Sequence, residues 1–173
     1  MVLVVLVVNT KECEIMKDLN LMELDMAHRY AMTCSGCTKV KVGSIIANDR
    51  RIISCGANRT IPRLCDSLRG CLRVEKYGDK SKEHRNPADC RAIHSEVDAI
   101  CNAAKNGIST DGATIYVTRY PCEACARAIV SAGIKDVIYG RKESISDETR
   151  KIFEYNNVEC YHFADWNAED DNS

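Results

Sequence analysis

Two short motifs in this sequence combine side chains that bind metals with a side chain that can move protons. The first is an H-x-E motif with His94 and Glu96, and the second is a P-C-x-x-C motif with Cys122 and Cys125. One imidazole and two thiolates are ligands that zinc accepts, and they leave its fourth tetrahedral position open to water. A carboxylate two residues from the histidine can reach that water without binding the metal. The two motifs together therefore predict hydrolytic attack at a zinc site, with Glu96 as the proton shuttle.

Each motif alone is ambiguous. A lone C-x-x-C also occurs as a redox pair or as half of a structural zinc site, and H-x-E arises by chance. Here both occur in one order, and each stands at the start of a predicted helix. The positive end of a helix dipole lowers the cost of a thiolate. This order and context are typical of zinc-dependent base deaminases.

The surrounding pattern predicts the elements that hold these motifs. Apolar residues at helical spacing favour an amphipathic helix over residues 14–33, and residues 42–47 and 51–55 are typical of a β-hairpin with a tight turn at 48–50. Further along, the pattern predicts a helix over 93–104 ended by Asn106-Gly107, a strand over 113–118, a helix over 122–132 ended by Gly133, a strand over 136–139, a helix over 147–155 capped by Ser146 or Asp147, and a strand over 158–163. We expect a three-layer α/β/α fold around a mixed five-stranded sheet, with an N-terminal hairpin and parallel later strands.

Length and composition indicate a single ordinary domain. The chain has 173 residues, 45% of them hydrophobic and 28% charged, with a formal net charge of -1. We expect an N-terminal extension over residues 1–13, one zinc-dependent deaminase domain over 14–163 and an acidic tail over 164–173. A near-neutral chain does not predict a partner of long nucleic acid. The apolar run at 2–8 is too short to span a membrane and follows no basic residue, so we expect neither a membrane partner nor a signal peptide.

The eleven cysteines indicate the compartment. Their odd number and the lack of a recognisable signal peptide favour a reducing cytoplasm, which would be that of the host cell for a viral protein. Clustered cysteine and histidine in that setting bind metals more often than they cross-link. Cys55, Cys101 and Cys160 fall on strand or helix faces and are expected in the core.

The chain resembles the deoxycytidylate (dCMP) deaminases of the cytidine deaminase-like superfamily over about Cys34 to Phe163. The resemblance is carried by the segments Cys37–Gly43, Arg51–Asn58, Cys90–Glu96, Gly112–Thr118 and Ala132–Tyr139, together with the two motifs. It implies that His94, Cys122 and Cys125 hold the catalytic zinc and that Glu96 shuttles protons. It further implies that dCMP is converted to dUMP with release of ammonia, that dCTP is a second substrate, and that the reaction supplies the thymidylate precursor.

The resemblance also implies substrate contacts. Asn58 matches the asparagine that meets the sugar in the family, although asparagine is also common in turns. Tyr120 is a candidate for the wall of the base pocket, with core packing as its other role. For the substrate phosphate the candidates are Arg59, Arg119, Arg141 and Lys142, each of which could equally be a solvated surface base.

A second zinc is expected in the long segment between the hairpin and the H-x-E motif. Several dCMP deaminases carry one, and a segment of some thirty residues with few apolar positions needs such a link. The candidate ligands are Cys37, Cys65, Cys71, His84 and Cys90. The alternative is a set of free or buried thiols. The family resemblance also implies a homo-oligomer, a hexamer in relatives, and dCTP and dTTP effectors, with Mg²⁺ accompanying the triphosphate.

The sequence departs from the family at three places. It has Gly56-Ala57-Asn58-Arg59 where Gly-Tyr-Asn-Gly is usual, no tyrosine after Gly140, and Asp98 where asparagine is common. Competing functions are deamination of free cytidine or another aminoheterocycle, editing of tRNA or single-stranded DNA, and a zinc module without activity. The acidic end of the chain and 6% aromatic residues disfavour the editor, and Glu96 disfavours the inactive module.

Overall fold

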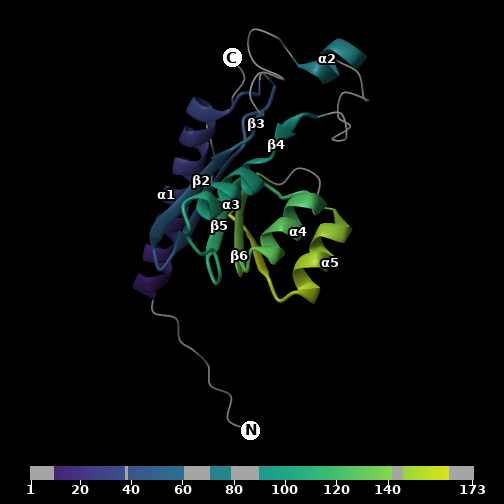
Figure 1. The fold of residues 1–173 in the computed structure, drawn as a ribbon. Coiled ribbons are helices and arrows are strands. Elements are labelled where there is room, and N and C mark those ends of the chain that lie inside the picture. The colour runs from purple at the N-terminus through teal and green to yellow at the C-terminus, as the bar shows by residue number, and fades with distance from the viewer. Residues whose placement is uncertain (1–9, 38, 61–70, 79–89, 142–145, 164–173) are drawn as a thin grey trace.

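A mixed β-sheet forms the centre of the molecule and lies between two layers of helices (Figure 1). The computed structural model describes residues 10–37, 39–60, 71–78, 90–141 and 146–163, with side chains from Asn20 onward. The helices are α1 (Thr10–Cys34), α2 (Leu72–Tyr77), α3 (Ser95–Lys105), α4 (Glu123–Ser131) and α5 (Asp147–Tyr155). The strands are β1 (Gly43–Asn48), β2 (Arg51–Ala57), β3 (Arg59–Thr60), β4 (Ala92–Ile93), β5 (Thr114–Arg119), β6 (Asp136–Arg141) and β7 (Glu159–His162).

The central sheet has five strands in the order β2-β1-β5-β6-β7. The β1–β2 and β1–β5 pairs are antiparallel, whereas β5, β6 and β7 run parallel. Asp49 and Arg50 both have positive φ in the turn of the β1–β2 hairpin, a geometry that matches the twist of paired strands. The expected α/β cytidine deaminase-like fold with an N-terminal hairpin is confirmed.

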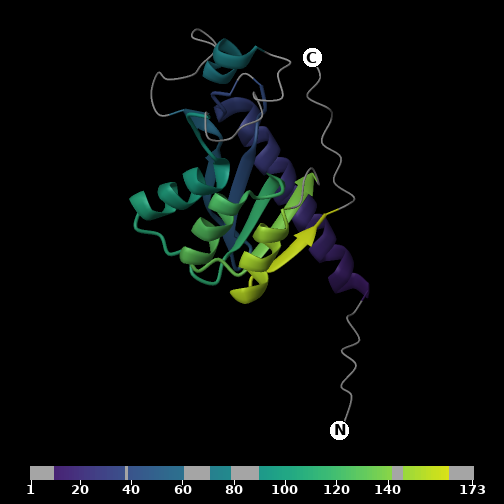
Figure 2. The same cartoon turned by 90° about the vertical axis from the view of Figure 1, so that its right-hand side faces the viewer.

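The helices divide between the two faces of the sheet. Helix α1 covers one face, and α3, α4 and α5 cover the other, as the rotated view shows (Figure 2). One apolar cluster fills the layer under α3–α5 around Ile115, Ile129 and Phe153. A smaller cluster lies under α1 around Leu24 and Ile45. Each layer thus buries its own apolar surface against a shared sheet.

Helix α1 turns a different face to the sheet from the one its apolar spacing suggests. Met22 and Met26 are exposed, whereas Leu24, Ala27 and Ala31 are fully buried. The close approach of helix and sheet decides this face, because a Cβ on Gly43 of β1 would overlap the carbonyl of Ala27. Small side chains fit such a contact and methionines do not.

Helix α3 follows the same rule. Gly56 of β2 lies so close to α3 that a Cβ there would overlap the backbone of Ser95 and Ala99. The buried apolar face consists of Ala99 and Ala103. The expectation that Cys101 is a core residue was wrong, because its side chain is exposed. Cys55 and Cys160 are partly buried and pack against the two apolar clusters.

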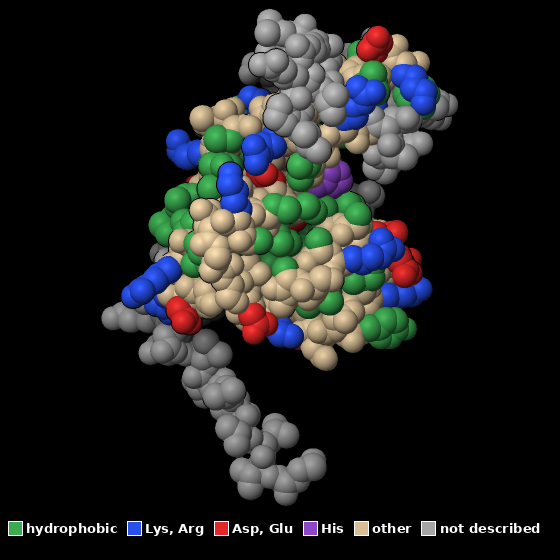
Figure 3. Space-filling model, viewed as in Figure 1, with side chains coloured by type: hydrophobic (Ala, Val, Ile, Leu, Met, Phe, Trp, Pro, Cys, Tyr) green, Lys and Arg blue, Asp and Glu red, His purple; other side chains and the backbone are tan. Residues whose placement is uncertain are grey.

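Three short elements stand apart from the central sheet. Strands β3 and β4 pair antiparallel, with Arg59 opposite Ile93 and Thr60 opposite Ala92, and α2 lies at the same end of the molecule (Figure 1). Among the described residues, no helix is long and apolar enough to cross a membrane. Basic and acidic side chains are interspersed over the described part of the face in Figure 3.

Candidate metal centre and substrate pocket

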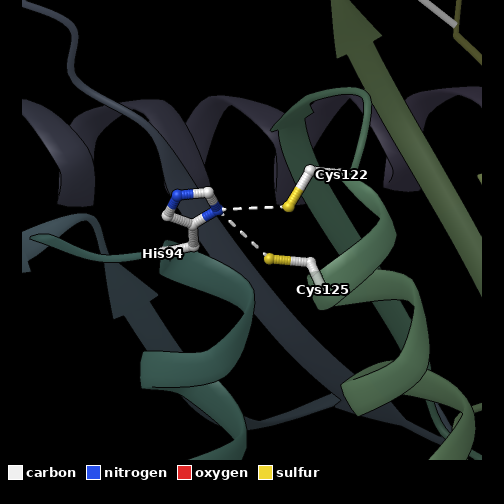
Figure 4. Close-up of side chains that lie close together, drawn as sticks. All are labelled: His94, Cys122 and Cys125. Carbon is white, nitrogen blue, oxygen red and sulfur yellow. Dashed lines mark hydrogen bonds between the residues drawn. The ribbon is translucent and has the colours of Figure 1, made fainter. Parts of the chain in front are cut away.

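The residues of the two motifs meet at the N-termini of two neighbouring helices. His94 immediately precedes α3, and Cys122 immediately precedes α4, with Cys125 in the first turn of α4. Figure 4 shows the imidazole of His94 directed at both sulfurs. Since α4 follows β5 directly, the sheet and the packing of α3 against α4 set the distance between the two motifs.

The donor set fits zinc. Nδ1 of His94 lies 3.4 Å from Sγ of Cys122 and 3.3 Å from Sγ of Cys125, and the three ligand atoms lie within 4.8 Å of one another. Ordinary zinc–sulfur and zinc–nitrogen bond lengths set a tetrahedral N···S edge of about 3.6 Å. Within the residues that the structure describes, this is the one group of three or more histidine, cysteine or acidic side chains with such proximity.

The titration of the three ligands reflects their closeness. A hydrogen bond from the Cys125 thiol, joined by one from His94, lowers the pKa of Cys122 to about 3. The same bond, together with burial, raises the pKa of Cys125. The pKa of His94 is raised, chiefly by its hydrogen bond to Cys122. The shifts favour a thiolate at Cys122 that accepts hydrogen bonds from Cys125 and His94, and a divalent cation bound to the three ligands would replace these protons.

Glu96 lies beside this cluster and is almost fully buried. The residue is only 4% exposed, and burial raises the pKa of its carboxyl group. One carboxylate oxygen, Oε2, accepts a hydrogen bond of 3.1 Å from Oγ of Ser95. A carboxyl group with a raised pKa takes up a proton more readily than an ordinary glutamate, which is a property that a general acid–base residue uses.

A cavity of about 190 Å³ opens next to the cluster. Its lining includes two of the three predicted ligands and the shuttle, together with predicted substrate contacts. The lining residues are Val42, Asn58, His94, Ser95, Glu96, Arg119, Tyr120 and Cys122. The ring of Tyr120 stands edge-on to Tyr139, with the centroids 4.9 Å apart, so the packing of Tyr139 fixes this wall.

Asn58 holds the chain that forms one side of this cavity. Its Oδ1 accepts hydrogen bonds from the N–H of Val42 at 2.8 Å and from the hydroxyl of Ser35, 2.6 Å away. Its amide Nδ2 donates to the carbonyl of Val40 at 2.7 Å. An amide group has two N–H donors, so one remains for a ligand in the cavity.

Arg59 is paired within the protein. Its Nε and one terminal nitrogen contact Oδ1 of Asp98 at 2.8 and 2.7 Å, and Oδ2 of Asp98 accepts the N–H of Ala57 at 3.2 Å. The Asp98 carboxylate is buried and needs these donors. The residues at two departures from the family pattern, Arg59 and Asp98, thus form one ion pair, and it links β3 to α3.

The other phosphate candidates lie at the carboxyl ends of the parallel strands. Arg119 ends β5 and Arg141 ends β6, and the two are register partners. Arg119 lines the cavity, whereas Arg141 is not among the described lining residues. Lys142 lies outside the described residues.

The candidates for a second zinc are gathered only in part. Cys37, Cys71 and Cys90 line one small apolar cavity between β3, β4 and α2. Cys65 and His84 lie outside the described residues. The pKa of Cys71 is lowered: burial opposes this shift, but hydrogen bonds with the backbone of Val74 and Arg73 and with the Arg73 side chain outweigh it.

Comparison with known proteins assigns the cluster to a class. The family model described as MafB19-like deaminase matches residues 7–169, nearly the whole chain. The chain belongs to the MafB19-like deaminase family. It is therefore a zinc-type deaminase of the cytidine deaminase-like superfamily, as its His-Cys-Cys cluster also indicates.

Relatives of this deaminase include phage and bacterial proteins. It is 36% identical over 123 residues to "ComE operon protein 2" of Bacillus subtilis (strain 168), covering 69% of this chain and 58% of that protein. It is 35% identical over 133 residues to the deoxycytidylate deaminase of Enterobacteria phage T4, covering 61% of this chain and 69% of that protein. A crystal structure of the dCMP deaminase of cyanophage S-TIM5, in complex with dCMP and dUMP, superposes with a TM-score of 0.67. The identity is 25%, and the match covers 84% of this deaminase and 96% of that chain.

The structure adds residues to the deaminase site that the sequence did not single out. Ser95 and Val42 line the cavity, and Ser35 bonds to Asn58. Ser95 occupies the variable position of the H-x-E motif, which was the only available signal. Ser35 and Val42 carried none, because their roles arise from the fold of the segment around them.

Proposed function

We propose that this deaminase hydrolyses the amino group at C4 of cytosine in dCMP and so produces dUMP and ammonia. The observation that carries the proposal is the placement of Glu96 and Arg119 around one cavity that His94 and Cys122 of the His-Cys-Cys cluster also line. The cluster and Glu96 supply deamination chemistry, and a guanidinium supplies a partner for a phosphate. Relatives whose names state deoxycytidylate deaminase support this choice of substrate.

The chain's own residues account for the proton transfers. His94, Cys122 and Cys125 would hold zinc, which lowers the pKa of water and makes it a nucleophile at neutral pH. Glu96 takes a proton from the water that adds to C4 and delivers it to N3 of the ring. Glu96 then passes the second proton to the amino group, and the C4–N bond breaks. The balance is one water consumed and one ammonia released for each cytosine converted to uracil.

The remaining wall residues position the substrate. We assign the free N–H of the Asn58 amide to the sugar, Tyr120 to the base and Arg119 to the phosphate. Arg141 extends the basic edge next to Arg119. Arg59 has a different role in this assignment, because its guanidinium pairs with Asp98.

A substrate panel tests the proposal. Release of ammonia is measured for deoxycytidine, dCMP, dCTP, CMP and a cytosine-bearing DNA oligomer, with Glu96→Ala as the blank. We expect dCMP to give the highest kcat/KM, with dCTP a weaker second substrate. A preference for deoxycytidine or for the oligomer would contradict the assignment of a nucleotide substrate.

A second, structural zinc is part of the proposal. Its ligands would come from Cys37, Cys65, Cys71, His84 and Cys90, and its support is that Cys37, Cys71 and Cys90 line one cavity, although their ligand atoms are not gathered as closely as those of the His-Cys-Cys cluster. We expect two zinc ions per chain by elemental analysis. Cys90→Ser should lower this to one and leave dCMP turnover measurable, whereas Cys125→Ser should lower it to one and abolish turnover. One zinc per chain in the unaltered protein would overturn this part.

We also propose a homo-oligomer with nucleotide effectors, on the strength of the family resemblance. Light scattering gives the mass of the assembly. Turnover of dCMP is then followed as dCTP or dTTP is added with Mg²⁺. We expect the rate to change when either nucleotide is added, and a rate that neither nucleotide changes would remove the effectors from the account.

A further inference from the structure

We propose that two buried serines, Ser44 and Ser95, form a hydroxyl chain that fixes the orientation of the Glu96 carboxylate. This inference rests on the proposed function, since it assigns the serines to the residue that exchanges protons during deamination. Both are positioning residues, because they act through Glu96. Ser95 occupies the middle of the H-x-E motif and begins α3, while Ser44 lies on β1, 51 residues earlier.

The geometry of the chain is continuous. Oγ of Ser44 lies 2.7 Å from Oγ of Ser95, and Oγ of Ser95 lies 3.1 Å from Oε2 of Glu96. Ser44 and Ser95 are both 0% exposed. Three polar side chains are thus joined in the interior, where hydrogen bonds are strong and an unmade one is costly.

The number of protons fixes the direction of these hydrogen bonds. A carboxylate only accepts, and each serine hydroxyl has a single proton to donate. When Glu96 is ionised, Ser95 therefore donates to Oε2, and Ser44 must donate to Ser95. Oε2 is held in this way, and the carboxyl group also interacts with its own backbone N–H and with the Cys125 thiol.

This arrangement suits a group that must act twice in one reaction. Glu96 takes a proton and gives one back, so its oxygens must keep their place as its charge changes. Hydroxyl groups can rotate and serve as donor or acceptor in turn, so the chain can accommodate both states of Glu96. Because it ends at the fully buried Ser44, the chain orients the carboxyl group and does not carry protons to solvent. Loss of such positioning lowers the rate of the chemical step.

A second buried serine on the sheet, Ser54, serves as a control that separates a packing role of Ser44 from a positioning role. Ser54 on β2 is 8% exposed, and its Oγ donates to the carbonyl of Ala99 at 2.6 Å. It joins the sheet to α3 as Ser44 does, but its hydrogen bond goes to the helix backbone and not to the Ser95–Glu96 pair. Ser54→Ala therefore removes a buried hydrogen bond between sheet and helix without removing one from the shuttle.

Steady-state kinetics of dCMP deamination test the chain. We expect Ser95→Ala to lower kcat about tenfold or more, because a hydrogen bond to a charged group is lost, with KM within about twofold. Ser44→Ala should lower kcat about threefold. Since both serines act through one bond to Glu96, the double variant should be no slower than Ser95→Ala alone. Ser54→Ala should keep kcat within about twofold, and zinc content should be equal in all four variants.

Three kinetic results would overturn the proposal: an unchanged kcat in Ser95→Ala, losses for Ser44 and Ser95 that multiply, or an equal loss in Ser54→Ala. Infrared spectroscopy provides a readout that does not depend on the substrate. The carboxyl bands of Glu96, identified by their loss in Glu96→Gln, should shift in Ser95→Ala and stay in place in Ser54→Ala. If no cytosine compound is deaminated, the proposed function fails, and these bands alone decide whether the serines hold Glu96.

Discussion

At the residue scale, most side chains of the site are bonded to other groups of the same chain. His94 lies next to two sulfurs, Glu96 accepts a hydrogen bond from Ser95, and Asn58 bonds mainly to the neighbouring backbone. Arg119 lies at the end of β5 and lines the cavity. Under the proposed function, the chemistry of the reaction and the choice of substrate depend on different residues.

Arg119 carries the prediction about substrate choice. Replacement of its guanidinium in Arg119→Gln should raise KM for dCMP about tenfold or more, because a charge-assisted hydrogen bond to the phosphate is lost. Turnover of deoxycytidine, which has no phosphate, should change less than about twofold. Arg127→Gln, which removes an arginine from the exposed side of α4, is the control. Equal losses on dCMP and deoxycytidine would show that Arg119 supports the fold of the cavity and does not select the phosphate.

The two motifs were sufficient to predict the residues that cluster, but not the network around them. H-x-E and P-C-x-x-C are each ambiguous alone, but both in this order, each at the start of a helix, indicate the chemistry of the site. The Arg59–Asp98 pair and the Ser44–Ser95 contact join residues 39 and 51 positions apart. Such pairs depend on how β1 and β2 lie against α3, and a pattern along one segment does not contain that information.

At the element scale, the site depends on how closely α3 approaches the sheet. Helix α3 carries His94 at its N-terminus and Glu96 in its first turn, and Gly56 of β2 lies against it. Any displacement of α3 from β2 therefore moves the shuttle relative to the cysteines on α4.

Gly56→Ala tests this dependence. The added Cβ would overlap backbone atoms of Ser95 and Ala99, which cannot rotate away, so we expect a loss of about 1–3 kcal/mol of stability and a fall in kcat. Gly107→Ala at the end of α3 is the matched control. Its Cβ would meet nothing within 4 Å, so its only cost is the backbone strain of a non-glycine residue at a φ of 68°. It should cost about 1 kcal/mol and leave kcat unchanged. Urea unfolding and dCMP turnover measure both effects, and an active, stable Gly56→Ala variant would contradict the close-approach argument.

The element pattern predicted strands more accurately than helix faces. The hairpin and the three parallel strands are where alternation and turn residues place them, and Ser146 caps α5 by accepting the N–H of Thr149. Helix α1 starts at Thr10, four residues before the predicted start. The sequence pattern missed this first turn because the turn is mostly polar and has no apolar repeat. The two-residue strands β3 and β4 and the short helix α2 are too brief for any periodicity to reveal.

At the scale of the whole molecule, the layer under α1 contains an acidic group that the reaction does not use. Glu23 of α1 is 2% exposed, and its Oε2 has no hydrogen-bond partner within the part of the chain that the structure describes. It lies near Tyr116 of β5, whose pKa is raised to about 12 by burial, with the Glu23 and Asp136 charges adding to the shift. Burial raises the pKa of Glu23 itself. The folded protein therefore holds a proton at Glu23 at pH values where the unfolded chain has lost it.

This difference makes stability depend on pH with a definite sign. Between the ordinary glutamate pKa of about 4.3 and the higher pKa in the fold, the folded state binds more protons, so the free energy of unfolding falls as pH rises. Glu23→Gln removes this dependence. Its melting temperature should exceed that of the unaltered protein at pH 7, by about 2–4 °C for each kcal/mol of penalty removed, and the gap should close towards pH 4. The control Glu154→Gln removes an exposed carboxylate, and a gap independent of pH would contradict the assignment.

The account as a whole requires that the two-helix cluster and its buried carboxyl group perform one reaction. Formation of dUMP from dCMP by zinc-loaded protein, compared with Glu96→Gln, tests this most directly. We predict steady turnover that Glu96→Gln lowers by roughly 10²–10⁴-fold while its zinc content is unchanged, because only the proton shuttle is lost. Turnover that survives in Glu96→Gln, or zinc-loaded protein that forms no dUMP at all, would contradict the central claim.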